Sequence, residues 1–323
     1  MNTLDDYLEE DRPPQSALMI SDAPEAELAA RNWLTNEGWK VRQVKTSREA
    51  VSALSMETFS LIVADDSKTC SSLATIFHLD QSVAALATPV IPFLLQNRDT
   101  ESAMIKNYGY PAKALKPTSR EVFLTCLQKV DEIWSTSEYL KLKQLATLSR
   151  ELTDLSIQKQ AFEILVPMLK NPVMNSVVAR ILALIHWQSG KVKEAEKILL
   201  AAVRNQPKHP ANLIALATFY VHFSQPALAV KLLRKGIVTH GTSCILKYPL
   251  AQALILLGQP KDAITILQML LRDQFQVRDI ELALAKLLLA EGQIAESERF
   301  LATIPEIHGI DLWHETKQHP VAG

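Results

Sequence analysis

The 323-residue sequence is poor in cysteine and has no apolar run of membrane length. Its three cysteines lie far apart and form no CxxC pair, which argues against a disulfide framework and favours reduced thiols. No segment reaches the ~18 apolar residues of a membrane helix. Residues 1–11 are acidic, whereas a secretory signal begins with basic residues. These absences predict a cytoplasmic protein without membrane insertion.

Catalytic and nucleic-acid-binding patterns are also missing. The sequence shows no nucleophile–base motif, no glycine-rich phosphate loop and no ligand spacing among its eight histidines, so we do not expect an enzyme. Residues 1–135 carry 13 Lys and Arg against 19 Asp and Glu, and residues 136–323 carry 21 against 16. Such a mild positive excess forms no basic stripe, so we expect no nucleic-acid partner. The asymmetry instead predicts two units with different surfaces.

The second half of the sequence contains a repeat of 34 residues. The recurring positions hold small residues, turn residues, leucines and again small residues: Ala161, Ala195, Ala229, Ala263 and Ser297; Gly190, Ser224, Gly258 and Gly292; Leu165, Leu199, Leu233, Leu267 and Leu301; Ser149, Ala183, Ala217, Ala251 and Ala285. Each copy fits two short amphipathic helices, such as residues 176–188 and 192–205. Glycine permits the tight turn between them.

This pattern resembles the tetratricopeptide repeat (TPR) over roughly residues 142–311. The resemblance implies an α-solenoid of about five repeats, assigned to residues 136–311, whose first helices form a groove for a partner protein. The residues expected in this groove are mostly apolar, with isolated cations: Val177, Arg180, Leu184, Trp187, Ile214, Val221, Tyr248, Ile255, Leu282 and Lys286. Such a groove suits an amphipathic helix. The same residues could instead pack internally or bind the chain's own tail, residues 312–323.

The first half, residues 16–135, alternates apolar strands with amphipathic helices. We expect strands at 16–21, 39–44, 61–64, 89–95 and 114–115, and helices at 24–37, 48–56 and 120–133. This alternation predicts a parallel sheet covered on both faces, and therefore an α/β domain followed by an all-α domain. Ligands of such sheets lie at the carboxyl ends of the strands, where Asp22, Asp65 and Lys116 would converge. Residues 1–15 are expected to be a flexible acidic segment.

Three short segments, residues 18–22, 61–65 and 115–117, resemble the receiver (CheY-like) domain of bacterial two-component response regulators. The resemblance covers about 120 residues. It implies a flavodoxin-like five-stranded parallel sheet, with Asp65 as phospho-acceptor and Lys116 as phosphate contact. It also implies a magnesium ion held by Asp22, Asp65 and Ser67, and a sensor histidine kinase as partner. The metal ion and the lysine would offset the negative charge that gathers when a carboxylate accepts a phosphoryl group.

Two positions depart from the receiver pattern. Ser21 stands where the family has an acid, and Leu94 stands where the family has the Thr or Ser that senses phosphate. Leucine has no hydrogen-bond donor for that task. Two hypotheses follow: a response regulator whose output is protein binding, and a constitutive scaffold with an inactive pseudo-receiver that assembles a multiprotein complex. Under the second, Asp65 is a relic carboxylate, Asp22 could cap the next helix, and Lys116 could pair with Asp65.

Overall fold

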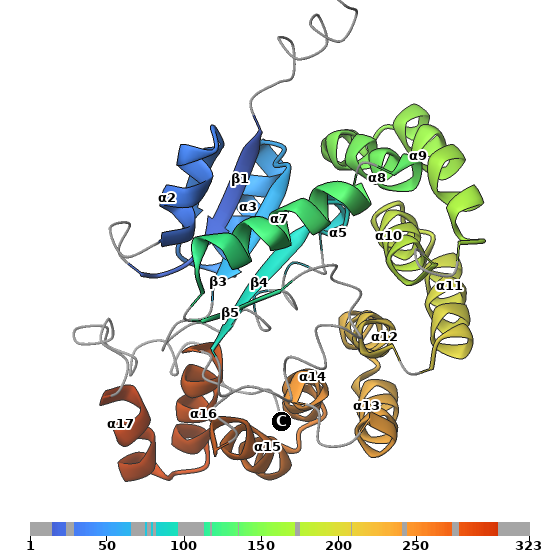
Figure 1. Ribbon diagram of the computed structural model, residues 1–323. Helices are drawn as coiled ribbons and strands as arrows, with labels where there is room; N and C mark the ends of the chain where they lie inside the picture. Colours follow the sequence, from blue (N-terminus) through green and yellow to red (C-terminus); the bar gives the residue numbers. More distant parts are fainter. Residues whose placement is uncertain are drawn as a thin grey trace, which may run out of the picture.

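The computed structural model describes residues 15–23, 29–65, 75, 79, 82–95, 113–116, 118–134, 136–171, 175–207, 209–240, 244–272 and 278–302. A parallel sheet with its helices is followed by a series of paired helices (Figure 1). The expected acidic segment before residue 15 and the expected tail at 312–323 lie outside the described residues.

The sheet contains five parallel strands in the order β2-β1-β3-β4-β5. They are β1 (Ser16–Ile20), β2 (Lys40–Val44), β3 (Leu61–Asp65), β4 (Val90–Leu95) and β5 (Ala114–Lys116). This is the flavodoxin-like, doubly wound order, in which the direction of winding reverses between β1 and β3. The register pairs Ile20 with Ala64 and Asp65 with Phe93, so the carboxyl ends of β1, β3 and β4 share one edge.

Helices cover both faces of the sheet because successive side chains of a strand point to opposite sides. One face packs against α2 (Ala29–Asn36) and α7 (Arg120–Trp134) through Met19, Val63 and Phe93. The other face packs against α3 (Ser47–Met56) and α5 (Val83–Leu86) through Leu18, Ile20 and Ile62. The sequence predicts α2, α3 and α7, but it does not predict α5.

Five helix pairs follow the sheet in the described part of the chain. They are α8 (Ser137–Leu148) with α9 (Leu155–Met168), α10 (Asn175–Gln188) with α11 (Val192–Asn205), α12 (Pro210–His222) with α13 (Pro226–His240), α14 (Cys244–Leu256) with α15 (Pro260–Arg272), and α16 (Arg278–Ala290) with α17 (Ile294–Ala302). The two helices of each pair pack on one another. This succession of helix pairs is the α-solenoid that the 34-residue repeat predicts.

The 34-residue positions have the structural roles that their residue types indicate. The alanines of the first series and the leucines between Leu165 and Leu267 are buried. Backbone φ is positive at the turn positions, namely 74° at Gly190, 56° at Ser224, 73° at Gly258 and 76° at Gly292. Glycine is favoured there because it adopts positive φ without steric cost.

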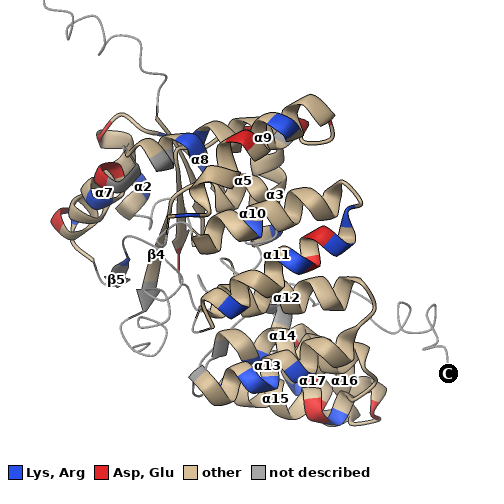
Figure 2. Cartoon of the chain, turned by 90° about the vertical axis from the view of Figure 1, so that its right-hand side faces the viewer, with Lys and Arg blue, Asp and Glu red and all other residues tan. Residues whose placement is uncertain are grey.

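The helix pairs form an arc around the carboxyl ends of the strands. In Figure 1 the arc begins with α8 and α9 beside the sheet and ends with α16 and α17, and the arrowheads of the strands point towards its inner side. In the view of Figure 2, Lys and Arg are interspersed with Asp and Glu along the helices. Among the described residues, every helix is too short or too polar to cross a bilayer.

Candidate functional site

The first candidate site lies at the carboxyl edge of the sheet, between β1 and β3. Asp65 is 2% exposed and Ser21 is 0% exposed. Ser21 Oγ donates a hydrogen bond to Asp65 Oδ2 at 2.8 Å and accepts one from the Ala23 backbone N–H at 3.2 Å. Gln43 Nε2 donates to the carbonyl oxygens of Ser21 and Ala23. In a doubly wound sheet this point of reversed winding is where ligands bind.

The structure describes some of the other residues predicted for this site. Asp22 follows Ser21 and is exposed, so it lies at the same edge as Asp65. Lys116 is the last residue of β5, and its backbone pairs with Leu95 of β4. The side chains of Lys116 and Leu94, and all of Ser67, lie outside the described residues. Gln43, whose two hydrogen bonds fix the chain after β1, carries no signal in the sequence for this role.

The carboxylates of Asp22 and Asp65 fit a magnesium ion, because this ion takes few of its ligands from the protein. Mg²⁺ commonly uses one or two carboxylates and completes its shell with water and phosphate oxygens, and Asp22 and Asp65 are two such carboxylates. One oxygen of Asp65 already accepts the Ser21 hydroxyl. Within the part of the chain that the structure describes, no third Asp, Glu, His or Cys joins these two carboxylates in a metal-binding group.

The second candidate site is a cavity of about 670 Å³ between α10, α12 and α14. Six of the ten predicted groove residues line it: Arg180, Leu184, Trp187, Ile214, Val221 and Ile255. The first helices of three successive repeats therefore meet around one hollow. Four predicted groove residues do not line the cavity: Val177, Tyr248, Leu282 and Lys286.

Tyr248 requires a correction. We expected its ring on the open face of the groove, but the residue is 6% exposed and belongs to the main hydrophobic cluster. Helix α14 is apolar over most of its length, so the sequence does not reveal which of its positions stay open. Val177 and Leu282 are half-buried and Lys286 is exposed.

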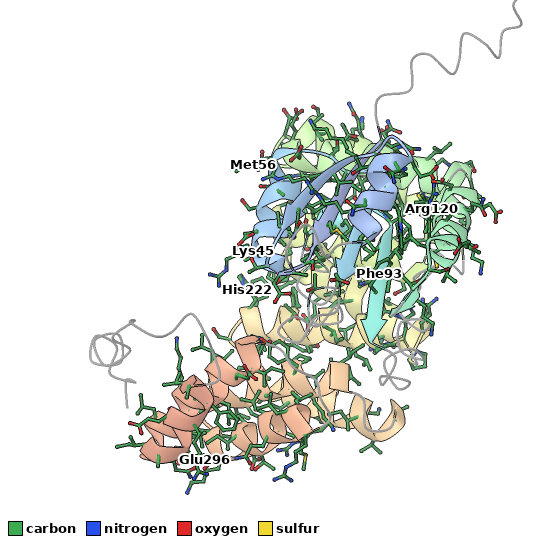
Figure 3. All side chains as sticks on the ribbon, turned by 60° about the vertical axis from the view of Figure 1, so that its left-hand side comes forward. Lys45, Met56, Phe93, Arg120, His222 and Glu296 are labelled. Atoms are coloured by element: carbon green, nitrogen blue, oxygen red, sulfur yellow. The ribbon has the colours of Figure 1, made fainter. Side chains whose placement is uncertain are left out.

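The cavity has an apolar wall with one buried cation. Arg180 is 4% exposed, and its Nε donates to the Ser176 carbonyl at 3.4 Å. No Asp or Glu is among the described residues that line the cavity. At its rim, the ring centroid of half-buried Trp187 is 4.5 Å from that of His222, which also lines the cavity. In Figure 3, His222 lies where the carboxyl ends of the strands approach the helical arc.

A buried hydrogen bond fixes α10 against α12 beside the cavity. Ser176 Oγ donates to Asn212 Oδ1 at 2.7 Å, and Asn212 Nδ2 donates to the Ala202 carbonyl at 3.3 Å. Asn212 is completely buried. Because a buried amide without partners is costly, this network favours one relative position of the two helices.

Comparison with known proteins finds solved structures that are similar to part of this chain. No protein-family model and no curated protein matches the sequence. The structure described as "MamA MSR-1 C2" is 19% identical, with a TM-score of 0.37, and the match covers 50% of this chain and 94% of that one. A thermophilic TPR protein of Thermus thermophilus is 20% identical (TM-score 0.38; 52% and 91% covered). The chemotaxis response regulator CheY4 of Vibrio cholerae is 18% identical (TM-score 0.32; 36% and 99% covered).

Proposed function

We propose that this protein is a signalling adaptor without enzymatic output, whose cavity between α10, α12 and α14 binds a segment of a partner protein. This proposal depends mainly on one observation: residues of α10, α12 and α14, the first helices of three successive pairs, surround one apolar hollow of about 670 Å³. Pockets of this size with apolar walls and few polar groups are typical binding sites. Trp187 and Ile255 remain half-buried at this surface, where a partner would remove them from water.

The partner segment is an amphipathic helix with apolar anchors and one acidic residue. Apolar side chains at i, i+3 and i+4 would enter the hollow over Leu184, Val221 and Ile255, which line it and are half-buried. An acidic side chain would meet the guanidinium of Arg180, since charge-assisted hydrogen bonds to carboxylates are strong and directional.

Site-specific crosslinking followed by affinity measurement tests this proposal. A photoreactive amino acid at Thr218, in the cavity wall, would capture the partner in the source cell, and a peptide of the captured segment would be titrated. Trp187→Ala should weaken binding by about 2 kcal/mol, or about 30-fold in Kd. Replacing the acidic residue of the peptide by its amide should weaken binding to the wild type. Ile294→Asp, at a half-exposed position on α17, is the control. Equal affinities for wild type and Trp187→Ala would refute the groove.

For the receiver-like domain we propose phosphorylation at Asp65 by a sensor histidine kinase. An oxygen of the Asp65 carboxylate would form a bond to phosphorus while the bond between phosphorus and the donor's histidine nitrogen breaks. A magnesium ion held by Asp22, Asp65 and Ser67 would neutralise phosphate charge when bound. Lys116 at the end of β5 would contact the phosphate. The position of Asp65 at the point of reversed winding supports this role.

A second candidate function is that of a constitutive scaffold with an inactive receiver. The hydrogen bond from Ser21 to Asp65 favours it, because the hydroxyl occupies a carboxylate oxygen without adding charge for a metal ion. In this case the sheet edge has only a structural role, and the groove binds its partner permanently.

Beryllofluoride with magnesium, a phosphoryl mimic, distinguishes the two candidates. If Asp65 is a phospho-acceptor, the ligand should raise the melting temperature of the wild type and leave Asp65→Asn unchanged. The stabilisation is about 2.7 kcal/mol at a hundredfold excess over Kd. Identical melting curves of the wild type with and without millimolar ligand would support the constitutive scaffold.

A further inference from the structure

Helix α5 connects the two halves of the molecule through buried side chains. Ala84 and Ala85 belong to the same hydrophobic cluster as Leu18 and Ile62 of the sheet. Val83, Leu86 and Ala87 belong to a different cluster, formed with residues of α8 and α10: Leu142, Leu145, Ala146, Val178, Ile181, Leu182 and Ile185. This short helix is therefore enclosed by the sheet on one side and the first helix pairs on the other.

Helix α10 packs one face against the cluster that contains α5 and lines the cavity with another face. Val178, Ile181, Leu182 and Ile185 follow the spacing i, i+3, i+4 and i+7 and pack in the cluster that contains α5. Arg180, Ala183, Leu184 and Trp187 follow the same spacing two residues later and line the cavity. Two residues correspond to about 200° around a helix, so the two stripes lie on nearly opposite faces.

We infer that the receiver-like domain forms part of the support of the groove: α5 fixes α10, and α10 thereby sets the positions of Arg180, Leu184 and Trp187. Close-packed interiors transmit displacements because they contain little free volume. A change at the sheet that moves α5 must move the cavity wall, and occupation of the cavity must act back on α5. The role of the cavity as a binding site rests on the proposed function, whereas the mechanical link does not.

The test requires neither a partner nor a phosphoryl group. The full chain would be labelled with 5-fluorotryptophan, and the ¹⁹F resonance of Trp187 would be assigned with Trp187→Phe. Leu86→Ala removes packing from α5 on its α10 side, and Val83→Ala is a milder change at the same contact. Both should shift or broaden the Trp187 resonance. Hydrogen exchange of the α10 amides should become at least about tenfold faster in Leu86→Ala.

Leu34→Ala is the matched control, because Leu34 is fully buried in α2 and belongs to a cluster that contains no residue of α5 or α10. It should leave the Trp187 resonance and α10 exchange as in the wild type. An unchanged Trp187 resonance in folded Val83→Ala would overturn the inference, as would an equal shift in Leu34→Ala, which would indicate general loosening. A shifted resonance together with unaltered partner affinity in Trp187→Ala would leave the link intact and refute the proposed binding site.

Discussion

The solenoid and the sheet edge differ in how many residues of the sequence fill the same structural role. In the solenoid, Ala195, Ala229 and Ala263 are all fully buried at the same position of successive repeats, so several copies support one assignment. At the sheet edge each task occurs once, and a single change such as Ser21 alters the site. Repeated positions therefore allow the fold to be predicted from the sequence. The properties of a site built from single residues depend on each individual contact.

The largest effect is expected for a leucine of the repeated series. Leu233 is fully buried, so Leu233→Ala should lower the free energy of unfolding by about 2–5 kcal/mol through lost burial and the cavity left behind. Urea denaturation measures this loss. Leu256→Ala, at a residue that is 60% exposed, should change it by less than about 0.5 kcal/mol. Similar losses for both variants would show that the repeat register is wrong.

At the sheet edge, Ser21→Ala should cost less. The variant removes the hydrogen bond that the buried Asp65 carboxyl group accepts at 2.8 Å, and a bond to a charged group is worth about 1.5–3 kcal/mol. Ser55→Ala removes an exposed hydroxyl bonded to the Ser52 carbonyl and serves as the control. If the two variants unfold at the same urea concentration, Ser21 does not hold Asp65.

The sequence predicted the repeated helices because the same periodic pattern returned in each copy, and α10 and α11 lie within one residue of their expected bounds. It did not predict α5, whose four residues are too few for a helical period and whose burial depends on contacts far along the chain. Six predicted groove residues line the cavity, but two of them, Arg180 and Ile214, are at least as buried as Tyr248, which does not line it. Periodicity identifies the face of a helix, not which part of that face neighbouring elements cover.

A larger side chain at a buried position of the repeat should destabilise the fold more than the same side chain at an exposed position outside the repeated series. Ala229→Leu should destabilise the fold by about 1–3 kcal/mol, because Ala229 is fully buried where helices meet closely. Ala201→Leu places the same side chain at an exposed position of α11 and should be nearly neutral. Thermal unfolding of the two variants measures the difference. Tolerance of leucine at Ala229 would mean that the paired helices do not meet there.

One repeat has serine instead of glycine at its turn. Exchanging serine and glycine between two repeats measures the free energy of placing a side chain there. Ser224 adopts φ = 56°, whereas Gly258 holds the equivalent position at 73°. Gly258→Ser should destabilise the fold by about 1 kcal/mol, because a side chain at positive φ is strained. Ser224→Gly should be neutral or stabilising by up to about 1 kcal/mol, since relief of strain is offset by greater freedom of the unfolded chain. If Gly258→Ser stabilised the fold and Ser224→Gly destabilised it, the two turns would not share this geometry.

The smallest expected effect concerns His186, whose imidazole stacks on Phe162 with ring centroids 4.8 Å apart. Burial lowers the pKa of His186, Lys191 lowers it further, and Glu194 opposes the shift. In the described part of the chain, its buried Nδ1 has no hydrogen-bond partner, so a proton gained there meets no acceptor. The folded state thus binds this proton less readily than the unfolded state, and the neutral ring is favoured on folding.

The contribution of His186 to stability is complete above the unfolded pKa of about 6.5 and is lost as the pH falls through the lower folded pKa. His186→Phe keeps an aromatic ring against Phe162 and removes the titration. Urea unfolding at pH 7.5 and pH 5.5 should therefore show a smaller loss of stability on acidification for the variant than for the wild type. Because the other titrating groups are common to both proteins, the difference between the two losses isolates His186. An equal loss in both would show that protonation of this ring is not coupled to folding.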